Sequence, residues 1–469
     1  MTERTRSHRS LIKAMHGAGR SQPLRHAQHG LAARTLWAAA GLFAAALACQ
    51  SSTAWAKPDT PELPPSQQES PSPANPATGY PPSAAAAETP SAGAITAITA
   101  ATTAPASSPA SVPSRAAPGQ PRHPGGDYGN REEVLQFAQE LAQRHGWNAE
   151  ATRRTLSQAR YLPRVAQLIM PPPVGTPKNW AAYRSRFIEP KRLQAGQQFW
   201  NAHERLLRKA ELRYGVPASL IVGIIGVETY YGKHLGGLRV LDALATLSFD
   251  FPSGRSDRSA FFRSELEAFL VWVRREGRAP QDIKGSYAGA IGWPQFMPSS
   301  ILRHAVDFDG DGHVNLERNM ADVVGSVANF LKHHGWIPGL PTHYPVEPPQ
   351  DAAARAELLA PDIVPSFSTL DMAARGAVLT EQALDHSGPL ALVALENGGG
   401  QPSYVAGTSN FYTLTRYNWS SYYALAVIEL GREVQEARDK ARLKAQPAAA
   451  SAKATKPAKL RSADKNQPG

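Results

Sequence analysis

Hydrophobic residues recur at intervals of three and four positions through most of residues 127–440, the spacing that places them on one face of an α-helix. The clearest predicted amphipathic helices span residues 131–145, 193–214 and 261–276. Near the C-terminus, apolar stretches at 390–395 and 403–406 flank the turn Asn397-Gly398-Gly399-Gly400 and predict a β-hairpin. The predicted fold class is therefore mainly α, with a small β part.

The N-terminus combines a basic segment with an apolar run of 14 residues at positions 36–49. The run is too short to cross a bilayer comfortably and has no surrounding core-forming sequence, so it is typical of a signal peptide. Ala54-Trp55-Ala56 matches a cleavage site and predicts a signal peptide at residues 1–56 with release of a soluble protein. The alternative is a lipid anchor at Cys49, because Ala46-Leu47-Ala48-Cys49 is similar to a lipoprotein box. As Cys49 is the single cysteine, a disulfide framework and a multi-cysteine zinc site are excluded.

Two further segments have compositions that predict disorder. Residues 57–126 hold 16 of the 40 prolines and one aromatic residue, so this linker cannot bury enough apolar surface to fold. The basic tail, residues 441–469, is expected to be disordered as well. The net charge of +11 lies in the ends of the chain, with +6 in residues 1–34 and +6 in residues 441–469. The remainder is nearly neutral, which disfavours a nucleic-acid-binding domain.

One predicted helix ends in a carboxylate. The segment after Pro217, SLIVGIIGVETYYG, is apolar on all sides up to Glu228. A carboxylate at the C-terminal end of a buried helix meets partial desolvation and the negative end of the helix dipole, and both raise its pKa. A raised pKa suits a general acid that works near neutral pH. The alternative is a glutamate that simply reaches solvent where the helix ends.

The segment KGSYAGAIGWPQFMPSS, residues 284–300, places three glycines among small residues. Such a segment lets the backbone approach a ligand closely. Ser286 and Gln295 would then supply hydrogen bonds, and Trp293 a flat face for a sugar. Close packing of this backbone against a neighbouring helix explains the glycines equally well.

A calcium loop is predicted by Asp307-Phe308-Asp309-Gly310-Asp311-Gly312-His313-Val314-Asn315, which matches the pattern D-x-D-x-D-G. Asp307, Asp309 and Asp311 would offer carboxylate oxygens and His313 its carbonyl oxygen, the hard ligands that Ca²⁺ prefers. Position 12 is Arg318, which cannot be a ligand, so Asp322 would close an enlarged loop. The alternative is a turn rich in Asx hydrogen bonds.

Aromatic and amide side chains cluster near the C-terminus, and this mixture is typical of a carbohydrate cleft. The cluster consists of Asn410, Phe411, Tyr412, Arg416, Tyr417, Asn418, Trp419, Tyr422 and Tyr423. Roughly half of these aromatic residues are expected to be ordinary core residues instead.

Six segments, in this order, resemble the lytic murein transglycosylase B family (glycoside hydrolase family 103) over residues 127–438. They are YGVPASLIVGIIGVETYYG, RVLDALATLSFDFP, KGSYAGAIGWPQFMPSS, VDFDGDGHVNL, VGSVANFLKHHGW and NFYTLTRYNWSSYYA. The resemblance implies a catalytic domain at 127–440 with a lysozyme-like core, an α subdomain, a small β subdomain and a calcium loop. It also implies a periplasmic enzyme of a Gram-negative bacterium, in some members lipid-anchored to the outer membrane.

The activity implied by the resemblance is cleavage of the β-1,4 bond between N-acetylmuramic acid and N-acetylglucosamine in peptidoglycan glycan strands, which leaves a 1,6-anhydro end. Glu228 matches the family's single catalytic acid. The matching sugar-binding positions are Ser286, Gln295, Tyr417, Asn418 and Tyr423, and the matching calcium positions are Asp307, Asp309, Asp311, His313 and Asp322. The sequence indicates no protein partner.

Two other functions stay open at the level of sequence. A hydrolytic muramidase would need a second carboxylate in the cleft, because most glycosidases use two. Asp242 and Glu265 are the candidates for that role. A non-catalytic peptidoglycan-binding scaffold is the other alternative, although an intact Glu228 beside intact sugar-binding segments argues against it.

Overall fold

The structure is a computed structural model that describes residues 128–170, 177–254 and 256–454, all within one compact unit of the chain. The predicted signal peptide, the linker and Cys49 lie outside the described residues. The helices are η1 (Tyr128–Asn130), α3 (Glu132–His145), α4 (Ala149–Leu156), α5 (Pro163–Leu168), α6 (Trp180–Arg184), α7 (Pro190–Tyr214), α8 (Ala218–Thr229), α9 (Val240–Phe249), α10 (Ser259–Arg275), η2 (Pro280–Asp282), α11 (Pro298–His304), α12 (Met320–His333), α13 (Ala352–Leu359), α14 (Thr369–Ala374), α15 (Glu381–Leu384), α16 (Ser409–Thr415) and α17 (Ser421–Ala454). The strands are β1 (Leu238–Arg239), β2 (Lys284–Gly285), β3 (His343–Glu347), β4 (Val378–Leu379), β5 (Ala391–Asn397) and β6 (Gly400–Gly407).

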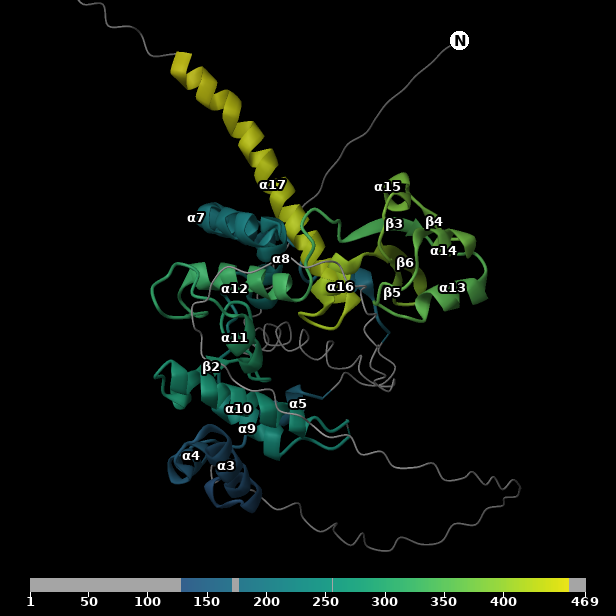
Figure 1. Cartoon of the computed structure of the whole chain (residues 1–469). Coiled ribbons are helices and arrows are strands. Elements are labelled where there is room, and N and C mark those ends of the chain that lie inside the picture. The colour runs from purple at the N-terminus through teal and green to yellow at the C-terminus, as the bar shows by residue number, and fades with distance from the viewer. Residues whose placement is uncertain (1–127, 171–176, 255, 455–469) are drawn as a thin grey trace, which may run out of the picture. The chain divides into compact units, whose positions relative to one another are not determined.

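The apolar helix α8 is buried along almost its whole length, and α7, α12 and α17 pack around it (Figure 1). A Cβ atom on Gly223 of α8 would lie 2.2 Å from the carbonyl oxygen of Val427 on α17. Reciprocally, a Cβ atom on Gly431 of α17 would lie 2.1 Å from the carbonyl oxygen of Ser219 on α8. The two helices therefore run antiparallel with their backbones almost in contact, which fixes the start of α17 beside the end of α8.

The remaining helices of the large core follow the predicted amphipathic pattern. α10 packs against α9 and α11, and it buries Phe262, Leu266, Phe269 and Val273 along one face. α3 packs against α4 in the N-terminal part of the domain. Among the described residues, no single helix is long and apolar enough to cross a membrane, and the pair α7 and α8, which passes that test together, is bent by 117°. The prediction of a mainly helical domain is confirmed.

A small β part has its own core. The predicted hairpin is present as β5 and β6, which pair antiparallel within a four-stranded sheet of order β4-β3-β6-β5. The pattern of the sequence did not predict β3 and β4, because β3 contains Pro345 and β4 is only two residues long. The buried residues beneath this sheet are Tyr344, Leu358, Met372, Ala377, Ala383, Leu390, Leu392 and Ala406.

The C-terminal helix is longer than the sequence predicts. Disorder was expected from residue 441, but α17 continues to Ala454. Arg438 and Arg442 on α17 both form ion pairs with Glu204 of α7, at 2.7 and 2.8 Å. The added residues extend a helix that packing has already nucleated, and half of them are alanine, which has the highest helix propensity and opposes the cost of Pro447. The structure therefore corrects the boundary for residues 441–454, while residues 455–469 lie outside the described part.

Candidate active site

The backbone turns sharply after the candidate acid at the end of α8. Tyr230 and Tyr231 both have left-handed backbone conformations, with φ of 53° and 54°, which are uncommon for residues other than glycine. The Tyr231 hydroxyl lies 2.5 Å from where a Cβ atom would stand on Gly196 of α7 or on Gly226 of α8. Two glycines thus make room for the ring that holds this strained turn, and strain of this kind persists only where the surrounding structure enforces it.

Glu228 is a partly exposed side chain in an apolar environment. Its Oε1 atom accepts a 2.7 Å hydrogen bond from the Tyr423 hydroxyl. Burial raises the pKa of Glu228 from its ordinary value of 4.5 to about 8, and the hydrogen bond from Tyr423 opposes that rise. No charged neighbour among the described residues contributes to the shift. Glu228 therefore keeps its proton at neutral pH, in the direction that the sequence predicted for a general acid.

This raised pKa makes the stability of the protein depend on pH. Between pH 4.5 and about 8 the folded protein holds a proton on Glu228 that the unfolded chain has lost, so burial of the side chain costs more stability as the pH rises through this window. We expect Glu228→Gln to have a higher melting temperature than the parent at pH 9, with a smaller difference at pH 5. Circular dichroism melts at the two pH values measure this. A difference independent of pH would contradict the raised pKa.

Two tyrosines from the C-terminal part of the chain connect the acid with the glycine-rich segment. The rings of Tyr417 and Tyr423 stack with centroids 6.0 Å apart and an interplanar angle of 17°. Tyr417 donates a 2.6 Å hydrogen bond to the carbonyl oxygen of Pro294. The side chain of Asn418, which follows Tyr417, is partly exposed and forms no hydrogen bond with another described residue. The structure therefore brings Tyr423 and Tyr417 to Glu228 and leaves the Asn418 amide free for a ligand.

The glycine-rich segment folds back on itself beside these tyrosines. Gln295 has a left-handed backbone with φ of 49°, and its Nε2 atom donates to the carbonyl oxygens of Gly292 (2.8 Å) and Leu235 (3.3 Å). The Ser286 hydroxyl oxygen accepts a 3.0 Å hydrogen bond from the backbone N–H of Ala290. The glycines are also closely packed, because a Cβ atom on Gly289 would lie 2.5 Å from the Leu244 side chain of the neighbouring helix α9.

Trp293 has contacts that the sequence did not indicate. Its indole N–H donates a 3.2 Å hydrogen bond to the carbonyl oxygen of Glu317. Its ring lies so close to Gly232 that a Cβ atom there would stand 2.4 Å from it. These contacts give Trp293 a role in the fold, whereas the sequence suggested a free face for stacking a sugar.

Both candidates for a second acid, Glu265 and Asp242, are buried and have partners elsewhere in the fold. Both oxygens of Glu265 accept hydrogen bonds from Ser299, one from its backbone N–H (2.9 Å) and one from its hydroxyl (2.6 Å). Asp242 accepts a hydrogen bond from the backbone N–H of Arg160 (3.1 Å) and lies 3.6 Å from the Arg239 guanidinium. Both carboxylates are buried and stabilise the fold.

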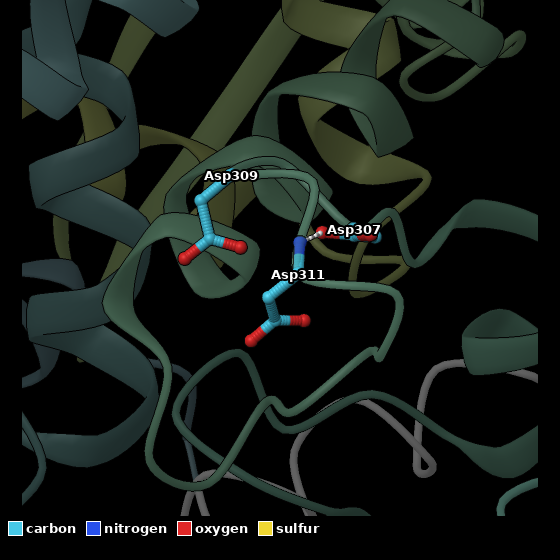
Figure 2. Close-up of side chains that lie close together, drawn as sticks. All are labelled: Asp307, Asp309 and Asp311. Atoms are coloured by element: carbon cyan, nitrogen blue, oxygen red, sulfur yellow. Dashed lines mark hydrogen bonds between the residues drawn. The ribbon is translucent and has the colours of Figure 1, made fainter.

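The predicted calcium loop gathers three carboxylates. Oxygen atoms of Asp307, Asp309 and Asp311 lie within 4.8 Å of one another (Figure 2). Gly310 and Gly312 have φ of 86° and 90°, which allows the tight turn between them. Backbone N–H groups of the loop, with that of Gly312 contributing most, lower the pKa of Asp307 and keep it ionised. Three clustered carboxyl groups supply the oxygen ligands that Ca²⁺ prefers, so these residues fit the ion.

Asp322, the residue predicted to close the loop, is hydrogen-bonded to both ends of it. It is fully buried at the start of α12, and its two oxygens accept the backbone N–H groups of Phe308 (2.9 Å) and Asn315 (2.8 Å). Asp322 therefore joins the beginning of the loop to its end and lies outside the three-carboxylate group. His313 is exposed and donates its backbone N–H to Asp311 at 2.9 Å.

Sequence reasoning missed two residues at these sites. Burial raises the pKa of Tyr183 of α6, and the nearby Glu228 carboxyl raises it further. The Nδ2 atom of Asn319 donates to carboxylates of Asp309 (3.0 Å) and Asp311 (3.5 Å). Tyr183 lies 45 positions from Glu228 in the sequence, so no local pattern could indicate it. Asn319, as a polar residue just before a helix, carried only the signal of an N-cap.

Comparison with known proteins identifies the family of this fold. The family model described as "Transglycosylase SLT domain" matches residues 129–432. The membrane-bound lytic murein transglycosylase B of Escherichia coli (strain K12) is 42% identical over 325 residues, which cover 67% of this chain and 86% of that protein. The chain belongs to the lytic murein transglycosylase B family. The protein is accordingly a lytic transglycosylase, an enzyme that acts on peptidoglycan.

Solved structures agree with this assignment. The catenated lytic transglycosylase SltB1 from Pseudomonas aeruginosa is 39% identical, with a TM-score of 0.61 over 66% of this chain and 100% of that chain. The Escherichia coli lytic transglycosylase Slt35 in complex with calcium is 41% identical, with a TM-score of 0.58 over 68% of this chain and 99% of that chain. These likenesses confirm the lysozyme-like fold class for the lytic transglycosylase described here.

Proposed function

We propose that this lytic transglycosylase cleaves the β-1,4 bond between N-acetylmuramic acid and N-acetylglucosamine with Glu228 as its single catalytic acid and base. The observation that carries the proposal is the placement of Glu228 at the end of the buried helix α8, where its carboxyl accepts a hydrogen bond from Tyr423 and burial raises its pKa to about 8. A carboxyl in this state can donate a proton at neutral pH.

In the first step, the Glu228 proton passes to the glycosidic oxygen while the bond between that oxygen and C1 of the muramic residue breaks. The electron pair of the bond leaves with the oxygen, and positive charge develops at C1. The hydroxyl of Tyr423, 2.7 Å from Glu228 Oε1, stabilises the carboxylate that remains. The N-acetyl group of the muramic residue shields the charge at C1.

In the second step, the C6 hydroxyl of the same muramic residue attacks C1 and its proton returns to Glu228. This closes the 1,6-anhydro ring and restores the acid, so protons and electrons balance without water. An attacking group held in the same molecule has a very high effective concentration and outcompetes water. The buried, hydrogen-bonded state of Asp242 and Glu265 supports a mechanism without a second carboxylate.

We assign glycan binding to Ser286, Gln295, Tyr417, Asn418 and Tyr423. Tyr417 and Tyr423 form a stacked pair beside the acid, and Asn418 follows Tyr417 in the chain with a partly exposed side chain. The hydrogen bonds of Gln295 and Ser286 fix the facing segment of backbone. Flat aromatic faces and preorganised amides are what a sugar ring needs for binding.

Mass spectrometry of the soluble products from purified peptidoglycan tests the reaction. We expect anhydro-ended muropeptides from the parent and from Glu265→Gln, and no products from Glu228→Gln. Reducing-end products from the parent would contradict the intramolecular step and indicate hydrolysis. Products that disappear in Glu265→Gln, with its fold intact by circular dichroism, would make that residue a second acid.

We further propose that the loop holds a structural Ca²⁺ ion through Asp307, Asp309 and Asp311, with the His313 carbonyl oxygen as a fourth ligand. The ion would neutralise carboxylates that otherwise repel one another within 4.8 Å. We propose Asp322 as the further ligand that closes the enlarged loop, since its carboxyl already joins the start of the loop to its end through two backbone hydrogen bonds.

Calcium is expected to raise the melting temperature of the protein. An ion that binds only the folded state at 100 times its dissociation constant stabilises that state by about 2.7 kcal/mol. Differential scanning fluorimetry with Ca²⁺ and with a chelator measures the shift. Asp309→Asn should abolish it, whereas Asp385→Asn, an exposed aspartate of the β part, should retain it. An equal shift in the parent and Asp309→Asn would place the calcium effect elsewhere.

We propose export to the periplasm through the signal peptide at residues 1–56, with release as a soluble protein and Cys49 as the alternative lipid attachment point. The mass of the mature N-terminus distinguishes the two. A chain that begins at Lys57 supports cleavage after Ala56, and a diacylglyceryl-modified Cys49 supports the anchor.

A further inference from the structure

The segment Trp293–Gln295 is held on one side by Leu316 and Glu317. These two residues follow the calcium loop and are called the calcium-loop limb. The backbone N–H of Trp293 donates to the carbonyl oxygen of Leu316 at 2.9 Å, and its indole N–H donates to that of Glu317 at 3.2 Å. The contact is close, because a Cβ atom on Gly292 would lie 2.4 Å from the Leu316 oxygen. Trp293 thus joins this limb through both its backbone and its side chain.

The same segment is held on its other side by the catalytic elements. The hydroxyl of Thr229, the residue after Glu228, donates to the carbonyl oxygen of Trp293 at 3.2 Å. The next carbonyl, that of Pro294, accepts the hydrogen bond from Tyr417 at 2.6 Å. Two consecutive residues, Trp293 and Pro294, therefore contact the calcium-loop limb, the end of α8 and Tyr417 of the tyrosine pair.

Hydrogen bonds also connect this limb with the residues of the calcium loop. Asp322 ties Phe308 at the start of the loop to Asn315 at its end. The Asn315 side chain accepts the backbone N–H of Glu317 at 3.1 Å, so the loop and the carbonyl that receives the Trp293 indole form one hydrogen-bonded unit. An ion that draws Asp307, Asp309 and Asp311 together fixes the shape of this unit.

We propose that Trp293 is a positioning residue that couples the calcium loop to the glycan-binding site. The inference rests on the proposed calcium and glycan sites and adds an energetic connection between them. Calcium restricts the motion of Leu316 and Glu317. Trp293, which is hydrogen-bonded to both, then holds its own carbonyl group and that of Pro294 where they accept hydrogen bonds from Thr229 and Tyr417. By linkage, calcium raises glycan affinity and glycan raises calcium affinity by the same factor.

Titration calorimetry on the full chain tests the coupling, in a Glu228→Gln background that prevents turnover. The probes are Ca²⁺ and a soluble peptidoglycan glycan fragment, each titrated with and without the other. We expect calcium to raise glycan affinity by about fivefold or more, the lower end of typical couplings between sites, with the reciprocal effect equal. In Trp293→Phe both ligands still bind, and the factor falls by about twofold or more, because the indole hydrogen bond to Glu317 is lost while the backbone bond to Leu316 remains.

Trp336→Phe is the matched control. Trp336 is buried and, like Trp293, donates its indole N–H to a backbone carbonyl, that of Gly215 at 2.7 Å, but among the described residues it forms no hydrogen bond with Leu316 or Glu317. The coupling should be retained in Trp336→Phe, and the calcium-induced change in tryptophan fluorescence should be reduced only in Trp293→Phe.

Several results would overturn the inference. If calcium does not change the glycan affinity of the Glu228→Gln background, there is no coupling. The proposed calcium site and the proposed reaction are unaffected by that result. If the coupling is lost equally in Trp293→Phe and Trp336→Phe, Trp293 contributes only to the general stability of the protein. Absence of calcium binding overturns both the coupling and the proposed calcium site, while the analysis of reaction products still tests the glycan chemistry separately.

Discussion

Glu228→Gln is expected to lower kcat by about 10⁴-fold, the upper end of what a single acid–base group contributes, because the same carboxyl serves in both proposed steps. Glutamine keeps the shape of the side chain and can still accept the hydrogen bond from Tyr423, but it cannot donate a proton to the glycosidic oxygen. KM should change little, since the assigned sugar contacts come from other residues. Steady-state release of muropeptides from peptidoglycan measures both constants.

The conservative variant Tyr423→Phe provides the comparison for this experiment. It removes the hydrogen bond that lowers the pKa of Glu228, so the pKa should rise further above 8. Activity that depends on the protonated acid then persists to higher pH than in the parent, at a reduced maximal rate. Activity of Glu228→Gln within tenfold of the parent, in a folded preparation, would show that another group supplies the proton.

Gly223→Ala is expected to destabilise the protein by about 2 kcal/mol, although alanine favours a helix over glycine by about 1 kcal/mol. The added Cβ atom would lie 2.2 Å from the Val427 carbonyl oxygen, and a backbone atom cannot move aside as the end of a flexible side chain can. The helices α8 and α17 must separate, which moves Tyr423 away from Glu228. We therefore expect kcat to fall about tenfold or more, because small misplacements of reacting groups are costly.

Urea unfolding and activity assays measure these two effects. Gly237→Ala is the control, because a Cβ atom there has no neighbour within 4 Å, and it should match the parent in both assays. Gly431→Ala, on the facing helix, should behave like Gly223→Ala, since its Cβ atom would lie 2.1 Å from the Ser219 carbonyl oxygen. A Gly223→Ala variant as stable as the parent would mean that the helix crossing is looser than the structure indicates.

Most of the helical fold could be predicted from the sequence because amphipathic spacing is a local signal. The expected helix at 193–214 is α7 (Pro190–Tyr214), and the one at 261–276 is α10 (Ser259–Arg275). The strands β3 and β4 and the extension of α17 past residue 440 could not be predicted in this way. Their stability comes from partners elsewhere in the chain, the sheet neighbours and Glu204, which local composition does not reveal.

The candidate site likewise has features that the sequence predicts and features that depend on tertiary contacts. The sequence by itself determined that Glu228 ends a buried apolar helix and that Asp307, Asp309 and Asp311 share one tight loop, because neighbours in sequence and helical periodicity suffice for both. Only the tertiary structure decided that Tyr423 donates a hydrogen bond to Glu228, which lies 195 positions away, and that Glu265 accepts hydrogen bonds from Ser299. Such contacts depend on how closely helices approach, and at α8 and α17 that distance is set by glycines whose effect appears only when the two backbones meet.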